Sequence, residues 1–141
     1  MLRHGIPEFR LPKHIMDREI QRLLNFGIDI KYNFKISKKE LENLSQTYDA
    51  VFLAIGAYQP KDVAVAIKGN NIIGVSSGLN FLLAHAYSPD ASQFNVFNVK
   101  GKMVAVVGGG NTALDTARTA LRLGGRPTIY YRRTRHEMPA H

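Results

Sequence analysis

The 141 residues fit the length of one ordinary domain, and 45% of them are hydrophobic, which is enough for a core. No apolar run approaches the roughly 20 residues that span a bilayer, and no secretory signal follows Met1, so we expect a cytoplasmic protein with no membrane segment. The absence of cysteine excludes disulfides, iron–sulfur ligation and thiolate zinc sites within the chain.

The formal net charge of +8 keeps nucleic acid open as an alternative partner. The 19 Lys and Arg are interleaved with acidic residues along the chain, except at 132–135. Nucleic-acid-binding domains usually show a clustered basic face or a recognisable motif, and this sequence has neither. We therefore expect no nucleic-acid partner. A basic surface can equally attract phosphorylated ligands or an acidic protein.

The first residues carry two prolines, Pro7 and Pro12, which exclude a continuous helix and favour an extended path. Arg10 lies between apolar residues in this segment, where a connecting loop and a ligand contact fit the pattern equally well. Residues 14–26 follow with the periodicity of an amphipathic helix. Residues 28–32 then alternate apolar and polar, which predicts a half-buried strand.

Ser37 and Glu40 have the spacing of a capping box, which predicts a short helix to about Gln46. Residues 48–57 read as a continuous apolar strand, of the kind buried on both faces of a parallel sheet, ending in a glycine turn. Ligands in open α/β sheets bind outside such strand ends, although a core strand with a tight turn is an equal alternative here.

Residues 59–101 form a looser connection. A short strand is predicted at 63–67, a helix at 77–87 and a turn-rich surface excursion at 88–100. The change in composition marks this stretch as the best candidate boundary between two sheet systems.

The most informative stretch is 102–133. A run of small and β-branched residues at 104–107 leads into a glycine triplet, a helical segment at 111–123 and a second β-rich run at 128–131. Strand, glycine turn, helix and strand in this order predict the first βαβ unit of a dinucleotide-binding fold. A glycine-rich turn that binds nothing is the alternative.

Each small residue of the motif has a physical role. Gly108 lets the backbone turn sharply, Gly110 lets a pyrophosphate approach the main chain, and Ala113 lets the helix pack closely on the strand. The pyrophosphate would then lie at the positive N-terminus of the helix.

Arg132 and Arg133 end the second strand, where an acidic residue would instead bind a free ribose 2′-hydroxyl. Guanidinium groups can hold a phosphate with two parallel hydrogen bonds, so the pair predicts NADP(H) rather than NAD(H). A solvated basic strand end is the alternative. The spacing of His136, Glu137 and His141 does not match a zinc-protease helix, so we expect no metal site.

Four blocks carry a resemblance to a known family, in the expected order: Gly5–Lys13, Tyr48–Ala57, Gly108–Asp115 with Ala117 and Arg118, and Tyr131–Ala140. The chain resembles an internal portion of the small (β) subunit of NADPH-dependent glutamate synthase. More broadly, it is similar to the FAD- and NADPH-binding oxidoreductases that include the flavin part of dihydropyrimidine dehydrogenase.

This resemblance implies an α/β, glutathione-reductase-type flavoprotein with two Rossmann-like nucleotide-binding domains and parallel sheets flanked by helices. NADPH would reduce FAD, and electrons would pass to iron–sulfur clusters outside this chain. The partner would be the glutamate synthase large subunit, which makes glutamate from glutamine and 2-oxoglutarate, or another iron–sulfur acceptor. The implied NADPH-binding residues are Gly108, Gly109, Gly110, Asn111, Thr112, Arg132 and Arg133, and the implied FAD-binding residues are Arg10 and Ile36.

On this basis residues 1–58 belong to the FAD-binding domain, 59–101 connect, and 102–141 begin the NADPH-binding domain. The family's FAD-binding glycine motif would lie upstream, so we expect an internal fragment that neither holds FAD nor turns over alone. No general base, nucleophile or metal cluster stands out, which fits chemistry carried by cofactors. The alternatives are a non-catalytic NADP(H)-binding module and, less favoured, a basic nucleic-acid-binding protein.

Overall fold

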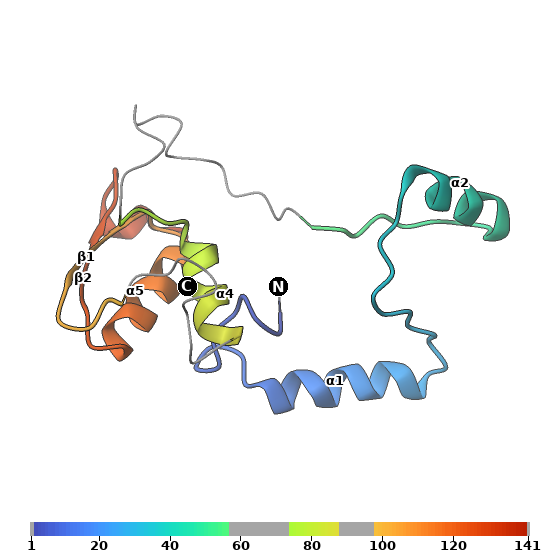
Figure 1. Ribbon diagram of the computed structural model, residues 1–141, viewed down its shortest axis with the longest axis horizontal. Helices are drawn as coiled ribbons and strands as arrows, with labels where there is room; N and C mark the ends of the chain where they lie inside the picture. Colours follow the sequence, from blue (N-terminus) through green and yellow to red (C-terminus); the bar gives the residue numbers. More distant parts are fainter. Residues whose placement is uncertain (1, 57–73, 88–97, 141) are drawn as a thin grey trace. The chain divides into compact units, whose positions relative to one another are not determined.

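The computed structural model describes residues 2–56, 74–87 and 98–140 (Figure 1). The chain divides into two compact units, one made of Met1–Asp17 with Pro60–His141 and the other of Arg18–Gln59. The elements in chain order are α1 (Lys13–Asn25), α2 (Lys38–Thr47), α4 (Gly78–Tyr87), β1 (Met103–Val107), α5 (Asn111–Arg122), β2 (Arg126–Tyr130) and the 3₁₀ helix η2 (Arg135–Glu137). The predicted strand at 63–67 and most of the predicted excursion at 88–100 lie outside the described residues.

The first unit is built on a parallel pair of strands joined through α5. β1 and β2 pair in register from Met103 opposite Arg126 to Val107 opposite Tyr130. Two parallel neighbours need a crossover connection, and α5 supplies it while packing against both strands. The predicted βαβ unit and the α/β class are confirmed.

The buried cluster of this unit joins three elements and a loop. The cluster consists of Phe81 from α4, Ala120 from α5 and Val99 from the loop before β1, and Val104 of β1 packs against it. The helix predicted over 77–87 is therefore confirmed, and its apolar residues do pack in the core. Small residues on α5 let the helix approach the strands closely: Ala120 is fully buried and Ala117 is 7% exposed.

A second contact holds α4 against the first turns of α5. A Cβ added at Gly78 would lie 2.8 Å from the Thr116 hydroxyl oxygen and 3.4 Å from the Thr112 methyl group. The Thr116 hydroxyl donates a hydrogen bond to the Thr112 carbonyl at 2.7 Å, so its polar atom is satisfied within α5. The start of α4 thus sits directly against the part of α5 that follows the glycine turn.

In the Arg18–Gln59 unit the predicted capping box is confirmed. The Ser37 hydroxyl accepts from the Glu40 amide at 3.3 Å, and the Glu40 carboxylate accepts from the Ser37 amide. Hydrogen bonds from the Ser37 side chain and backbone to the Glu40 carboxylate lower the pKa of Glu40, because they favour its ionised form. The helices predicted at 14–26 and from Ser37 to about Gln46 are both confirmed, each within a residue or so of its observed ends.

The two strands predicted in this part of the chain are wrong. Residues 28–32 and the described part of 48–57 have no regular secondary structure. A strand exists only through ladder hydrogen bonds to a neighbour, and no described residue of this unit is paired with either segment. The apolar side chains are correspondingly exposed, Phe52 by 92% and Ile55 by 74%. The hydrophobic pattern identified segments suited to a sheet, but the pattern does not supply the neighbouring strand.

We predict that His85 makes the first unit sensitive to acid. Its Nε2 is buried without a hydrogen-bond partner in the described structure, its ring meets Phe81 edge-on at 4.6 Å, and burial lowers its pKa below the ordinary 6.5. A lowered histidine pKa means that the unfolded chain binds the proton more readily. Stability is therefore full above pH 6.5 and is lost as the pH falls through 6.5 towards the lowered value.

Thermal melts between pH 7.5 and pH 5 test this, and the fall in Tm should be smaller in His85→Leu by a few degrees. His14→Leu, a change at an exposed position of α1, is the matched control and should keep the parent's pH dependence. An unchanged pH profile in His85→Leu would show that this imidazole does not govern the acid response.

Candidate functional site

The glycine turn and the arginine pair lie at the same edge of the sheet. Val107 pairs with Tyr130 as the last residues of β1 and β2, and the Gly108 amide extends the ladder by donating to the Tyr130 carbonyl at 2.9 Å. The chain then runs into the glycine triplet after β1 and into Arg132 after β2. Ligands of open α/β sheets bind outside this carboxyl edge.

Gly108 has the two properties that the sequence predicted for it. Its φ of +137° lies in the region that side chains disfavour, and a Cβ there would come within 3.3 Å of the Ala113 Cβ. Small residues at both positions therefore let α5 pack directly against the end of β1.

The start of α5 is shaped to receive an anion. Gly110 is the N-cap residue, it makes no side-chain capping bond, and a Cβ added to it would meet nothing within 4 Å. Asn111 and Thr112 follow as exposed residues of the first turn. Helix N-termini present backbone N–H groups and the positive end of the helix dipole, so the open space beside Gly110 fits a phosphate.

Gly109 has a role that sequence reasoning missed. A Cβ at this position would lie 2.6 Å from the nearest carbon of the Tyr131 ring, so the ring occupies the space that a side chain would need. The Gly109 carbonyl also accepts a hydrogen bond from the Ala140 amide at 3.2 Å. The middle of the glycine turn is thus held by the segment that follows β2, and the assignment of Gly109 to the pyrophosphate stays a prediction.

Arg132 and Arg133 are both exposed, two and three residues after the end of β2. Among the ion pairs that the described residues form, none includes either side chain. Both guanidinium groups therefore keep their hydrogen-bonding capacity for a phosphate. Their position at the edge that carries the glycine turn is the arrangement that the sequence predicted.

A second capping box, which sequence reasoning also missed, follows the arginines. The Thr134 amide and hydroxyl donate to Glu137 Oε2 at 3.1 and 2.8 Å, and the Tyr131 hydroxyl donates to the Glu137 carbonyl at 3.0 Å. The bonds from the Thr134 backbone and side chain lower the pKa of Glu137, so its carboxylate stays ionised. The Thr-x-x-Glu spacing was the available signal, identical in form to the box recognised at Ser37.

Comparison with known proteins assigns the chain to a family. The chain matches the pyridine nucleotide-disulphide oxidoreductase family over residues 3–140. The chain belongs to this family. The pyridine nucleotide in the family's name agrees with the βαβ unit and the glycine turn described above.

Curated relatives confirm the resemblance to glutamate synthase small subunits. The chain is 34% identical to the glutamate synthase [NADPH] small chain of Escherichia coli (strain K12), over 99% of its own length and 30% of that protein. It is 42% identical to the NADPH-Fe(3+) oxidoreductase subunit beta of Geobacter sulfurreducens, covering 99% of the chain and 20% of that protein. It is 40% identical to the NADP(+)-dependent formate dehydrogenase subunit beta of Moorella thermoacetica, over 100% of the chain and 19% of that protein. The chain thus spans about a fifth to a third of these relatives.

In this member of the pyridine nucleotide-disulphide oxidoreductase family, Arg10 contacts α5. Its Nε donates to Asp115 Oδ1 at 2.7 Å, and the Asp115 residue is only 4% exposed. One and two turns further along α5, the guanidinium groups of Arg118 and Arg122 lie over the Phe9 ring at 4.4 and 4.5 Å. Three residues on one face of α5 therefore hold the N-terminal segment.

The predicted FAD-binding roles remain predictions. Ile36 immediately precedes the α2 capping box in the Arg18–Gln59 unit and is 45% exposed. Arg10 lies in the first unit, in contact with the helix that follows the glycine turn.

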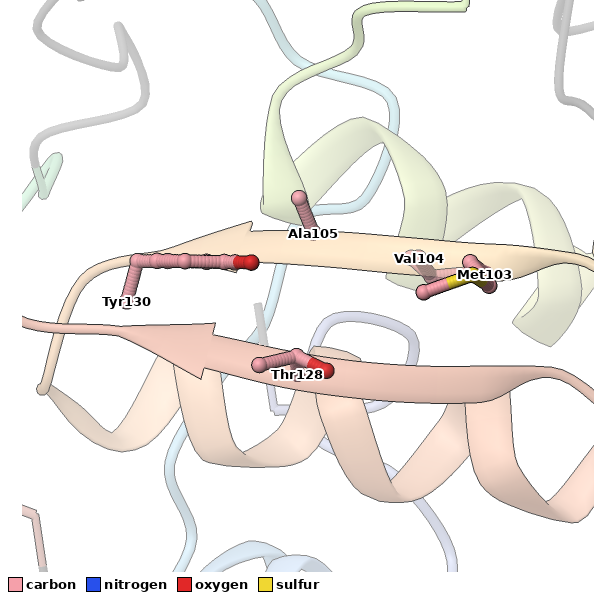
Figure 2. A pocket seen from close by; sticks show the side chains of 5 residues that line it. All are labelled: Met103, Val104, Ala105, Thr128 and Tyr130. Atoms are coloured by element: carbon pink, nitrogen blue, oxygen red, sulfur yellow. The ribbon is translucent and has the colours of Figure 1, made fainter.

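A small hollow of about 120 Å³ lies on the strand pair, and none of the predicted site residues is among those that line it (Figure 2). Its lining residues are Met103, Val104, Ala105, Thr128 and Tyr130. Met103 and Val107 are exposed on the same strand in which Val106 is buried, so one face of the pair is open in the described structure. Parallel sheets are usually covered on both faces, and this hollow suits packing of another layer better than recognition of a nucleotide.

The described residues show neither a metal-binding cluster nor a helix that could span a membrane. No cluster of three or more His, Cys, Asp or Glu side chains there has the arrangement of a metal site. None of the described helices combines the length and apolar character needed to cross a bilayer.

We predict that Gly109→Ala destabilises the first unit by about 1 to 3 kcal/mol, as overpacking usually does, because the new methyl group meets the Tyr131 ring. Gly110→Ala is the matched control. Its methyl group enters open space, so the free energy of unfolding should change by less than about 0.5 kcal/mol.

Urea unfolding measures both changes. In a Tyr131→Ala background the penalty of Gly109→Ala should largely disappear, because the clashing ring is gone. Equal penalties with and without the ring would contradict the assigned contact.

We predict that Arg10→Ala lowers the free energy of unfolding by about 2 to 3 kcal/mol, because it leaves the buried Asp115 carboxylate without its charged partner. Replacing both residues, as Arg10→Ala/Asp115→Ala, should recover part of that loss, since no unpaired charge then remains.

Arg3→Ala is the matched control, since the Arg3–Asp17 pair is about half exposed on both sides. Its loss should cost no more than about 1 kcal/mol. Equal effects of Arg3→Ala and Arg10→Ala in the same denaturation experiment would show that burial of Asp115 does not matter.

Proposed function

We propose that this chain is the NADPH-binding part of a flavin-dependent oxidoreductase. The observation that carries the proposal is the meeting of two features at the carboxyl edge of β1 and β2. One is the open, uncapped start of α5 at Gly110, and the other is the exposed pair Arg132 and Arg133. The first suits a pyrophosphate and the second a ribose 2′-phosphate.

The names of the relatives support the choice of nucleotide. The Geobacter and Escherichia proteins are named for NADPH and the Moorella protein for NADP(+). The same names differ in the other reactant: Fe(3+), formate and glutamate synthesis. We therefore propose NADPH as the shared reductant, with glutamate synthesis as one candidate for the wider reaction.

When bound, NADPH would supply a hydride to FAD, and we propose that the electrons then pass to iron–sulfur clusters outside this chain. We propose that this chain's own residues bind and orient the dinucleotide, with residues 102–141 starting the NADPH-binding domain and residues 1–58 contributing to the FAD-binding domain. FAD contacts by Arg10 and Ile36 belong to this proposal, supported by the resemblance. So do a cytoplasmic location and an iron–sulfur partner such as the glutamate synthase large subunit.

Calorimetric titration with 2′,5′-ADP and with 5′-AMP tests the proposal, because the two probes differ only in the 2′-phosphate. The chain should bind 2′,5′-ADP more tightly. Arg132→Ala/Arg133→Ala should weaken that binding about a hundredfold, as expected for the loss of charge-assisted hydrogen bonds worth about 3 kcal/mol, and leave 5′-AMP binding unchanged.

Arg18→Ala/Arg22→Ala is the matched control. It removes the same charge from the exposed face of α1 and should change neither titration. Equal affinity of the parent chain for the two probes would argue against NADP selectivity. Salt-sensitive binding of arbitrary duplex DNA, lost in Arg132→Ala/Arg133→Ala, would favour a polyanion site instead.

A further inference from the structure

The two arginines sit between two anchored residues. On one side, the Tyr131 ring packs on Gly109 and its hydroxyl donates to the Glu137 carbonyl at 3.0 Å. On the other, Thr134 donates to the Glu137 carboxylate through its amide at 3.1 Å and its hydroxyl at 2.8 Å. The backbone of Arg132 and Arg133 therefore spans a short gap whose two ends are both tied to Glu137.

This set of contacts buries little, so its value for folding is small. Thr134 and Glu137 are exposed, and the nearest regular element is η2, a single 3₁₀ turn. Exposed turns of this kind usually tolerate change. Here the turn is nevertheless held by four hydrogen bonds: the three just described and the bond from the Glu137 amide to the Thr134 carbonyl at 3.1 Å.

The same contacts hold the Glu137 carboxylate against Thr134 through its Oε2 atom. Glu137 is the nearest acidic residue in sequence to Arg132 and Arg133, and an ion pair with either would neutralise the charge that a phosphate needs. Instead its carboxylate accepts two hydrogen bonds from Thr134. The pKa of Glu137 is lowered by these bonds, so the carboxylate remains an acceptor for Thr134 around neutral pH.

The segment also reaches back to the glycine turn. The Ala140 amide donates to the Gly109 carbonyl at 3.2 Å, and the Tyr131 ring covers the same residue. One short stretch of chain thus contacts the turn that suits the pyrophosphate and carries the arginines that suit the 2′-phosphate. Such a stretch can fix the spacing between the two anion sites.

We propose that Tyr131, Thr134 and Glu137 are positioning residues for 2′-phosphate recognition: they hold Arg132 and Arg133 at a fixed distance from the glycine turn without touching the nucleotide. We call these three residues the arginine brace. The inference rests on the proposed function and deepens it. Selectivity for the phosphorylated nucleotide then depends on hydrogen bonds within the protein as well as on the two guanidinium groups.

The test is calorimetric titration of brace variants with 2′,5′-ADP and 5′-AMP. Thr134→Val keeps the shape of the side chain and removes its hydroxyl, and Glu137→Ala removes the acceptor. Thr134→Val should weaken 2′,5′-ADP binding about tenfold, as expected for the loss of one charged hydrogen bond, and Glu137→Ala, which loses two, at least as much. Both variants should leave 5′-AMP binding unchanged. The conservative variants Thr134→Ser and Glu137→Gln keep a donor and an acceptor and should restore most of the affinity.

Ser37→Ala/Glu40→Ala is the matched control, because it removes a capping box of the same form from α2. It should leave both titrations unchanged. Circular dichroism of every variant checks that the fold is retained. If Glu137→Ala unfolds the chain, Thr134→Val and Glu137→Gln carry the test.

A double-mutant cycle separates positioning from general support. In the Arg132→Ala/Arg133→Ala background, Glu137→Ala should cause no further loss of 2′,5′-ADP affinity, since the arginines through which it acts are gone. Additive losses, equal losses for the two probes, or no loss in Thr134→Val and Glu137→Ala would each overturn the brace while leaving the proposed function standing. No preference for 2′,5′-ADP in the parent chain would overturn the proposed function and the brace together.

Discussion

The parallel pairing of β1 with β2 is the constraint on which the described site depends. Parallel neighbours end at the same edge, so the glycine turn after β1 and the arginines after β2 meet there although 21 residues separate Gly110 from Arg132. An antiparallel pair would have placed them at opposite ends. The crossover helix that this pairing requires also starts at that edge, which brings the positive end of α5 to the same place.

α5 organises the rest of its unit by presenting a different side to each neighbour. Ala117 and Ala120 are buried with the core, Thr112 and Thr116 meet Gly78 at the start of α4, and Asp115, Arg118 and Arg122 hold the N-terminal segment. Asp115 is costly to bury, since a carboxylate with 4% exposure requires a charged or hydrogen-bonding partner. Arg10, more than a hundred residues away in sequence, provides it.

The chain belongs to the pyridine nucleotide-disulphide oxidoreductase family. Two questions about its function can therefore be separated: which nucleotide is recognised, and which electron acceptor is used. We propose that nucleotide recognition resides in the β1–α5–β2 unit and the segment after it, where the glycine turn, the arginine pair and the arginine brace act together. The relatives named for NADPH or NADP(+) have different second reactants. On this proposal the described residues determine which nucleotide is the reductant. The electron acceptor depends on other parts of the proteins in which such a unit occurs.

Local signals in the sequence determined most of the helices and the βαβ unit. A glycine triplet between an apolar run and a helical period, and a Ser-x-x-Glu box, act within a few residues of themselves, so they could be read directly. The tertiary structure decided what depends on distant partners. Residues 28–32 and 48–56 have strand-like patterns but no paired neighbour among the residues that the structure describes. The contacts of Tyr131 with Gly109 and of Arg10 with Asp115 join segments far apart in the chain. Such pairings are set by how the elements pack, because neither residue type nor spacing specifies which distant group will be adjacent.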